Sequence, residues 1–193
     1  MNRIFNLTLI ILISLTFSSC GYNEMVSLDE SLKESWANVE TQYQRRANLI
    51  PNLVETVKGY ANFEKETLTE VIEARAKATS IQVSGDDLTP ENLQKFQKAQ
   101  NQLSGALSRL LVTIEKYPDL KANQNFMDLQ NQLEGTENRI AQEIRNFNAS
   151  VREYNTYVRS FPQMLYAGMF GFKSKPAYEA EDGSEKAPEV SFE

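Results

Sequence analysis

The sequence predicts an all-α protein, an antiparallel up-and-down four-helix bundle with long helices and a coiled-coil-like core. Three observations indicate this fold. Apolar residues recur at spacings of three and four in four segments, and no stretch shows the strict apolar–polar alternation that is typical of a strand. Turn-forming residues separate most of these segments. The chain has 193 residues, a size that suits one domain.

The first residues resemble a secretory signal. Arg3 supplies a positive charge, and residues 4–17 form an apolar run shorter than the ~20 residues of a spanning helix. Phe17-Ser18-Ser19-Cys20 then resembles a lipobox, and Cys20 is the only cysteine. The resemblance implies cleavage before Cys20 and acylation of that residue. The alternative is an ordinary signal with an incidental cysteine.

These features divide the chain into four parts. We expect a lipoprotein signal peptide over residues 1–19, a lipidated linker over 20–26, a helical bundle over 27–162, and an apolar segment with an extended polar tail over 163–193. Gly21 stands where bacterial inner-membrane retention signals usually have Asp. The expected location is therefore extracytoplasmic, at the outer membrane facing the periplasm if the cell has one.

Pro51 separates the first two periodic segments, 28–50 and 53–75, and leaves two alternatives. The apolar phase continues across it, which favours one kinked helix. However, a helix from about residue 26 to 80 would be ~80 Å long, more than the later segments can cover. We therefore expect a hairpin, with Asn48 or Asn52 as a cap.

The later breaks have clearer turn signals. Thr89 and Pro90 suit the N-cap and first position of the third helix. Pro118 ends that helix and Pro162 ends the fourth, because a residue before proline disfavours the helical conformation. After Lys173 the chain becomes polar and we expect an extended tail.

Several ordered blocks resemble the LemA family over nearly the whole mature chain. The most specific match comprises Arg45-Arg46, residues 49–54 and residues 57–60, and further matches are Tyr117-Pro118, residues 136–140, Phe161-Pro162 and Phe170-Gly171-Phe172. The resemblance implies a helical bundle of uncertain molecular function, held at a membrane by its N-terminus. Asn48 stands where the family usually has Asp, and a lipobox replaces the family's usual transmembrane helix.

The residue content argues against catalysis. The chain has no His, and lipidation would consume Cys20. No Gly-rich phosphate loop is present, and a di-iron bundle site needs Glu-x-x-His pairs. We therefore predict no catalytic residue, no cofactor and no metal site; an all-carboxylate cation site is the alternative. The formal net charge of −6 argues against nucleic acid as a partner.

Two groups of residues are candidate sites. The hairpin model places Glu64, Gln100 and Thr136 in a buried polar layer, with Arg45, Arg75 or Arg139 as partner; alternatively, Glu64 is in solvent. The same model brings two family-like blocks to the membrane-distal tip, which makes this tip the candidate partner surface. Its residues are Arg45, Arg46, Asn48, Pro51, Asn52, Tyr117 and Pro118. The alternative is that one arginine snorkels while the other pairs with a carboxylate.

The functional hypothesis is a non-enzymatic, lipid-anchored envelope protein that scaffolds or binds a protein partner, with a homo-oligomer as a further option. The alternative is a membrane-associating or membrane-remodelling protein that acts through oligomerisation and the apolar segment after Phe161. That segment could equally pack on the end of the bundle.

Overall fold

The computed structural model describes residues 2–60 and 64–179, with side chains for residues 21–60 and 64–179. All regular elements in these ranges are helical, which confirms the all-α prediction. The α-helices are α1 (Asn2–Lys58), α2 (Lys65–Ser80), α3 (Pro90–Ile114), α4 (Pro118–Lys121) and α5 (Gln124–Arg159). Short 3₁₀ helices cover Gly85–Asp87, Gln163–Leu165 and Ala167–Phe170.

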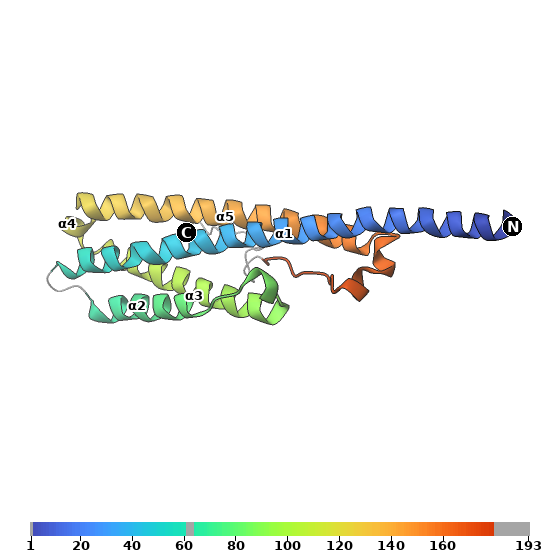
Figure 1. Cartoon of the computed structure of the whole chain (residues 1–193). Coiled ribbons are helices and arrows are strands. Elements are labelled where there is room, and N and C mark those ends of the chain that lie inside the picture. Colours follow the sequence, from blue (N-terminus) through green and yellow to red (C-terminus); the bar gives the residue numbers. More distant parts are fainter. Residues whose placement is uncertain (1, 61–63, 180–193) are drawn as a thin grey trace, which may run out of the picture.

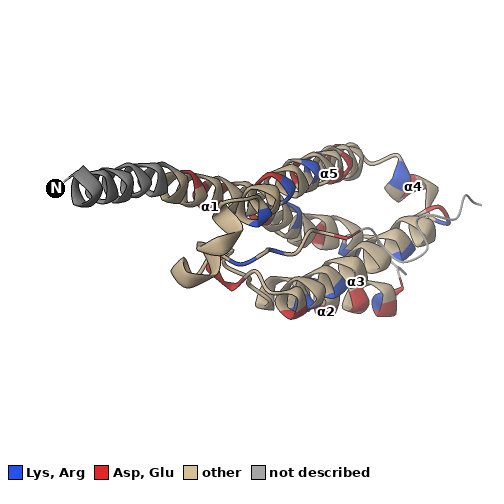
Figure 2. Cartoon of the chain, turned by 90° about the vertical axis from the view of Figure 1, so that its right-hand side faces the viewer, with Lys and Arg blue, Asp and Glu red and all other residues tan. Residues whose placement is uncertain are grey.

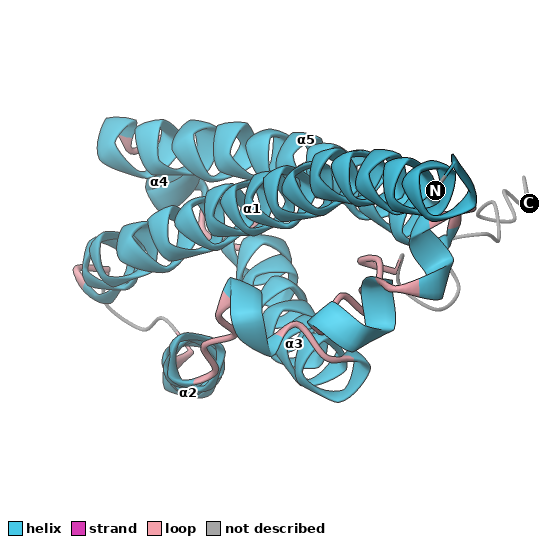
Figure 3. Ribbon diagram, turned by 45° about the vertical axis from the view of Figure 1, so that its right-hand side comes forward, coloured by secondary structure: helices cyan, strands magenta, loops and turns pink. Residues whose placement is uncertain are grey.

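The long helices form two neighbouring pairs (Figures 1 and 3). Helix α1 packs mainly against α5, and α2 packs mainly against α3. Helix α1 extends past the other helices at its N-terminal end. We call the end that contains Tyr60 and α4 the distal end, and residues 160–172 at the opposite end the base.

Pro51 lies inside α1, so the predicted hairpin is wrong. A proline has no N–H to donate to the carbonyl four residues earlier, here that of Ala47. Arg75 of α2 supplies the missing donor, because its Nε lies 2.7 Å from the Ala47 carbonyl oxygen. The helix therefore passes through Pro51 while the freed carbonyl keeps a hydrogen bond.

The length argument failed because α1 ends at Lys58 instead of continuing to residue 80. The part of α1 from Gly21 onward is about 57 Å long, and the 36 residues of α5 span about 54 Å. A single partner helix can therefore cover most of this face. Helix α2 has only 16 residues, so the four long helices are far from equal in length.

The predicted helix boundaries after α2 agree with the structure. The Thr89 side chain accepts a hydrogen bond from the Asn92 backbone N–H at 3.2 Å, and Pro90 is the first residue of α3. Asn123 caps α5 in the same way, at 3.1 Å from the Phe126 N–H. Pro118 follows the end of α3 but also opens the short helix α4.

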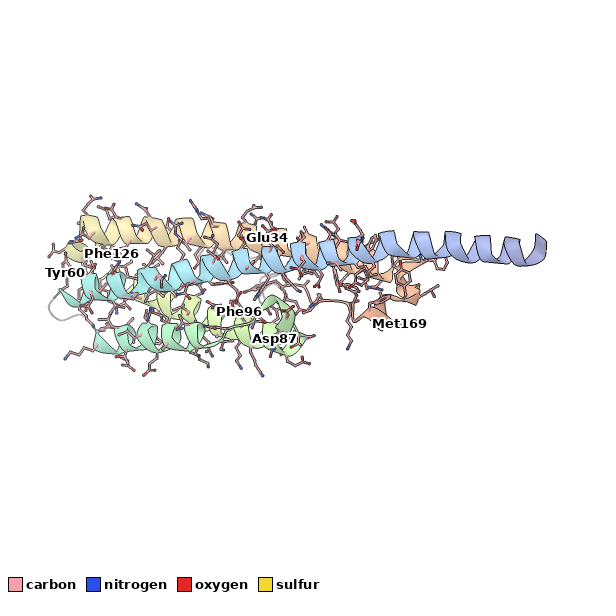
Figure 4. The ribbon with its side chains drawn as sticks, viewed as in Figure 1. Glu34, Tyr60, Asp87, Phe96, Phe126 and Met169 are labelled. Carbon is pink, nitrogen blue, oxygen red and sulfur yellow. The ribbon has the colours of Figure 1, made fainter. Side chains whose placement is uncertain are left out.

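Buried side chains form two clusters along the molecule. The distal core is mostly aliphatic and joins the second half of α1 to α2, α3 and the start of α5; it includes Ile50, Leu53, Val57, Val71, Leu103, Leu110, Ile114 and Phe126. The proximal core is rich in aromatic residues and includes Leu32, Trp36, Tyr43, Phe96, Phe147, Val151 and Tyr154. Figure 4 shows Phe126 and Phe96 in these two separate regions.

The C-terminal part of the described chain has two sections. Residues 163–170 form short 3₁₀ turns at the base, and residues 172–179 then run back along the helices without regular structure. The remainder of the predicted polar tail, 180–193, lies outside the described residues, as do the side chains of the predicted signal peptide and Cys20.

Candidate functional site

A buried arginine lies between the two cores. The Arg46 side chain on α1 is 1% exposed. Its guanidinium donates to Gln100 Oε1 at 2.7 Å and to Ser104 Oγ at 2.9 Å, both on α3. It also forms an ion pair with Glu137 of α5 at 2.7 Å. One side chain thus connects three helices.

The charge of Arg46 is only partly compensated inside the protein. Glu137 is its counter-ion, and that side chain is 47% exposed, so water screens the pair from one side. The Arg46 Nε is buried without a hydrogen-bond partner among the described residues. The guanidinium carbon also lies 5.0 Å from the centre of the Tyr43 ring, in a cation–π contact. This environment fits a structural connection and leaves the cation little access to a ligand.

The predicted polar layer is partly displaced. Gln100 and Thr136 are buried, at 5% and 2% exposure. Glu64 is exposed, because it precedes the first residue of α2 near the distal end and pairs only loosely with Lys116, at 3.6 Å. The prediction that Glu64 joins the layer is wrong, since it assumed a second helix beginning near residue 53.

The predicted arginine partners also have other roles. Arg45 and Arg139 are exposed, and Arg75 bonds the Ala47 carbonyl. Arg46, assigned from the sequence to the partner surface, instead supplies the buried cation. The signal was present: Arg46 lies three residues after Tyr43 and four before Ile50, which are both buried.

The remaining residues of the predicted partner surface fall into two separate groups. Arg45, Asn48, Pro51 and Asn52 are exposed along α1. Tyr117 and Pro118 belong to the turn at the distal end. That turn meets Tyr60, whose hydroxyl accepts a hydrogen bond from Asn123 Nδ2 at 2.9 Å. The distal end is therefore built around Tyr60, not around the arginine pair.

The base exposes large apolar side chains. Phe161 is 77% exposed, Met164 59%, Leu165 66%, Met169 84% and Phe170 58%. The segment also contacts the bundle: Ala167 is buried, and the Tyr22 ring contacts the ring of Phe172 and one side of the exposed Phe170 ring. The segment thus packs partly on α1, as one alternative predicted, and still presents an apolar surface.

The described residues offer little chemistry. They contain no group of three or more His, Cys, Asp or Glu placed to hold a metal ion. Burial is the main reason that the pKa of Tyr43 lies well above its usual range, and the neighbouring Tyr178 adds to this. Within the part of the chain that was described, no helix is long and apolar enough to cross a membrane. Charged residues of both signs are spread over the helices (Figure 2).

Comparisons with known proteins identify relatives of this chain. The chain is 26% identical over 139 residues to protein LemA of Metamycoplasma hominis, covering 72% of this chain and 60% of that protein. It is 27% identical over 169 residues to the magnetosome protein MamQ of Magnetospirillum gryphiswaldense, covering 79% of this chain and 62% of that protein. The chain thus spans about three fifths of the length of these relatives. The model of the LemA family matches residues 35–192, and the chain belongs to this family.

Proposed function

We propose that this chain is a non-enzymatic, lipid-anchored protein of the bacterial cell envelope that scaffolds or binds protein partners. Membership of the LemA family and similarity to MamQ support a membrane or envelope protein without catalytic activity. In this proposal the four longer helices act as one antiparallel up-and-down bundle. The α1–α5 and α2–α3 packing supports that arrangement.

The observation that carries the proposal is the position of the exposed apolar side chains. They lie at the base, where Tyr22 contacts Phe170 and the Tyr166 hydroxyl lies against Gly21. A lipid on Cys20 would therefore attach beside an apolar surface. Two or three acyl chains together with such a surface give stable anchoring, whereas one chain alone is marginal. The distal end then points away from the membrane. If the cell has an outer membrane and the lipid lies in it, the distal end points into the periplasm.

The anchor is tested by Cys20→Ser in the full chain. We expect this variant to lose incorporation of a labelled palmitate analogue and to leave the membrane fraction of cells. Retention of both label and membrane association by Cys20→Ser would show that the anchor lies elsewhere.

The partner surface in this proposal is the exposed face of α1 that carries Arg45, Asn48 and Asn52, and it is tested by crosslinking in cells followed by pull-down. Arg45→Glu reverses an exposed charge on α1 at the level where the two cores meet, and Arg145→Glu makes the same change on α5 beside the proximal core. We expect Arg45→Glu to lose a crosslinked protein that the unaltered chain and Arg145→Glu both retain. Identical crosslinking by all three chains would argue against this surface.

A second candidate function is membrane association or remodelling through the base itself. The five exposed apolar side chains favour it, since moving apolar surface from water into a bilayer interface is worth roughly 25 cal/mol per Å². The test uses the mature chain, residues 20–193, with Cys20→Ser and vesicles of phosphatidylethanolamine and phosphatidylglycerol. We expect vesicle flotation to carry this unlipidated chain.

Two variants distinguish vesicle binding through the base from nonspecific hydrophobic binding by other exposed side chains. Phe161→Ser with Met169→Ser removes two of the most exposed apolar side chains of the base, and Val112→Ser removes one that is 70% exposed on α3. We expect only the double variant to reduce flotation severalfold. No flotation of the unlipidated chain, or equal flotation of all variants, would rule out this candidate.

A further inference from the structure

The returning tail is held by its backbone at two asparagines of α5. Asn155 Nδ2 donates to the Lys175 carbonyl at 2.8 Å, and Asn155 Oδ1 accepts from the Lys175 N–H at 2.8 Å. Asn148 forms the same pair with Tyr178: its Nδ2 donates to the Tyr178 carbonyl at 2.9 Å, and its Oδ1 accepts from the Tyr178 N–H at 2.8 Å. Each side-chain amide therefore forms the pair of hydrogen bonds that one strand residue exchanges with its neighbour in an antiparallel sheet.

The spacing of the two asparagines fits an extended chain. They are seven residues apart, which is about 10.5 Å along a helix. The residues they bind are three apart, which is about 10 Å along an extended chain. Pro176 has no backbone N–H, but none is needed there, because the two asparagines bond only Lys175 and Tyr178.

Side chains of the tail are recognised by α1. The Tyr178 hydroxyl lies 2.6 Å from the hydroxyl of the buried Tyr43. The Lys175 ammonium lies 4.0 Å from the Asp29 carboxylate. Helix α3 adds Gln97, whose Nε2 lies 3.5 Å from the Glu179 carbonyl oxygen. Three helices thus form a groove that contacts the tail at its backbone, at the Lys175 ammonium and at the Tyr178 hydroxyl.

The tail does not fill this groove. One hollow remains between α5 and Ala177, and another lies between the start of α3 and Pro176. Ser174 and Ala177 are exposed, and Lys175 and Tyr178 are only partly buried. The tail is therefore held largely by hydrogen bonds, and only Phe172 and Tyr178 of it pack against the margin of the proximal core.

We propose that this groove is a peptide-binding site for an extended segment of the Lys-Pro-Ala-Tyr type, that residues 172–179 are its ligand within the chain, and that the same segment of a second copy takes the site in exchange. Main-chain hydrogen bonds provide affinity and side-chain contacts provide specificity, as in other sites that bind extended peptides. Every copy carries both halves of the contact, which is the condition for exchange of an identical element between protomers. This site stands independently of the membrane anchor.

The peptide site is tested in solution with the mature chain carrying Cys20→Ser and Tyr178→Ala, which weakens its own ligand. The probe is a fluorescent peptide with the sequence of residues 172–179, followed by fluorescence polarisation. We expect saturable binding that weakens at least tenfold when Asn148→Ala and Asn155→Ala are added. A probe with alanine in place of its tyrosine is expected to bind more weakly.

Circular dichroism shows whether the asparagine variants fold. If the double alanine variant does not, Asn155→Asp serves instead, because it keeps the side-chain size and the acceptor but removes the donor to Lys175. Absence of probe binding to the Tyr178→Ala chain, or equal binding with and without intact asparagines, would overturn the site.

Exchange of the tail between two copies is tested by sedimentation velocity on the mature Cys20→Ser chain. We expect self-association as concentration approaches the effective concentration of a short tether, on the order of 1 mM. Asn148→Ala with Asn155→Ala is expected to remain monomeric over the same range. Probe binding without any self-association would overturn the second copy as the occupant and would point to a segment of another protein.

Discussion

The distal and proximal cores solve the same packing problem with different residues. Where α1, α2, α3 and α5 are all present, aliphatic side chains fill the interior and Phe126 is the one fully buried aromatic ring among the described residues there. Helix α2 ends at Ser80, so the proximal half lacks one helix. Large aromatic rings fill the interior of the proximal half instead, and Trp36 contacts both Phe96 and Phe147.

Irregular segments complete the proximal core. The loop after α2 contributes Val83 and Leu88, and the Trp36 indole donates to the Val83 carbonyl. The returning tail contributes Phe172 and Tyr178 at its margin. A missing helix is thus replaced by bulky aromatic side chains, a loop and a tail, and hydrogen bonds to backbone carbonyls hold these segments in place.

The largest expected effect comes from removing the centre of the proximal core. Trp36→Ala leaves a large cavity and should reduce the free energy of unfolding by about 3–5 kcal/mol. Leu110→Ala makes a smaller cavity in the distal core, where aliphatic neighbours can partly close around it. Urea denaturation followed by circular dichroism measures both free energies of unfolding. Tryptophan fluorescence would not serve, because Trp36 is the only tryptophan. A greater loss from Leu110→Ala would reverse the ranking of the two cores.

The boundary between the cores is tested with neighbouring arginines. Arg46→Met leaves Gln100 Oε1 buried without its donor, so we expect a loss of about 1–3 kcal/mol. Arg45→Met changes an exposed side chain and should stay within about 0.5 kcal/mol. The same denaturation experiment compares them. Equal effects would mean that the buried position of Arg46 adds nothing to stability.

The continuity of α1 is tested by a double-mutant cycle. Arg75→Ala leaves the Ala47 carbonyl without its hydrogen bond and should cost about 1–2 kcal/mol. Pro51→Ala restores a backbone N–H at the position that helical geometry pairs with Ala47. We therefore expect Arg75→Ala to cost less in the Pro51→Ala background. Strict additivity of the two changes would contradict the link between Arg75 and Pro51.

Alkaline pH should affect the proximal core selectively, because it contains buried tyrosines. Burial, with a contribution from the Asp29 charge, raises the pKa of Tyr154 to about 12. The unfolded chain releases this proton near pH 10, whereas the folded chain keeps it. Stability is therefore fully present below pH 10 and declines as the pH rises toward 12. Thermal melts at rising pH measure the decline, which Tyr154→Phe should reduce; an unchanged slope would exclude Tyr154 as its source.

The smallest effect is expected at Glu64. Its exposed position before α2 predicts that Glu64→Leu changes the free energy of unfolding by no more than about 0.5 kcal/mol. Chemical denaturation again provides the measurement. A large stabilisation by leucine would indicate that this position is buried in solution and would bring it back into the distal core.

The sequence by itself determined the features that depend on near neighbours. The recurrence of apolar residues predicts helices, and Thr89 with Pro90 marks the start of α3, because a cap bonds the backbone only three residues away. The residues that resemble the LemA family also predicted a membership that the family match shows. Lipidation of Cys20 stays a prediction from the same local pattern.

Only the tertiary structure decided the features that depend on distant residues. The carbonyl that Pro51 leaves without a helical donor is bonded by Arg75, 28 residues away. Which side chains pair with the buried Arg46 depends on where Gln100 and Glu137 lie on other helices. The tail is held by asparagines 20 and 30 residues away. The chain's local pattern carries no information on these pairings, because they arise from how the helices pack and where α2 ends.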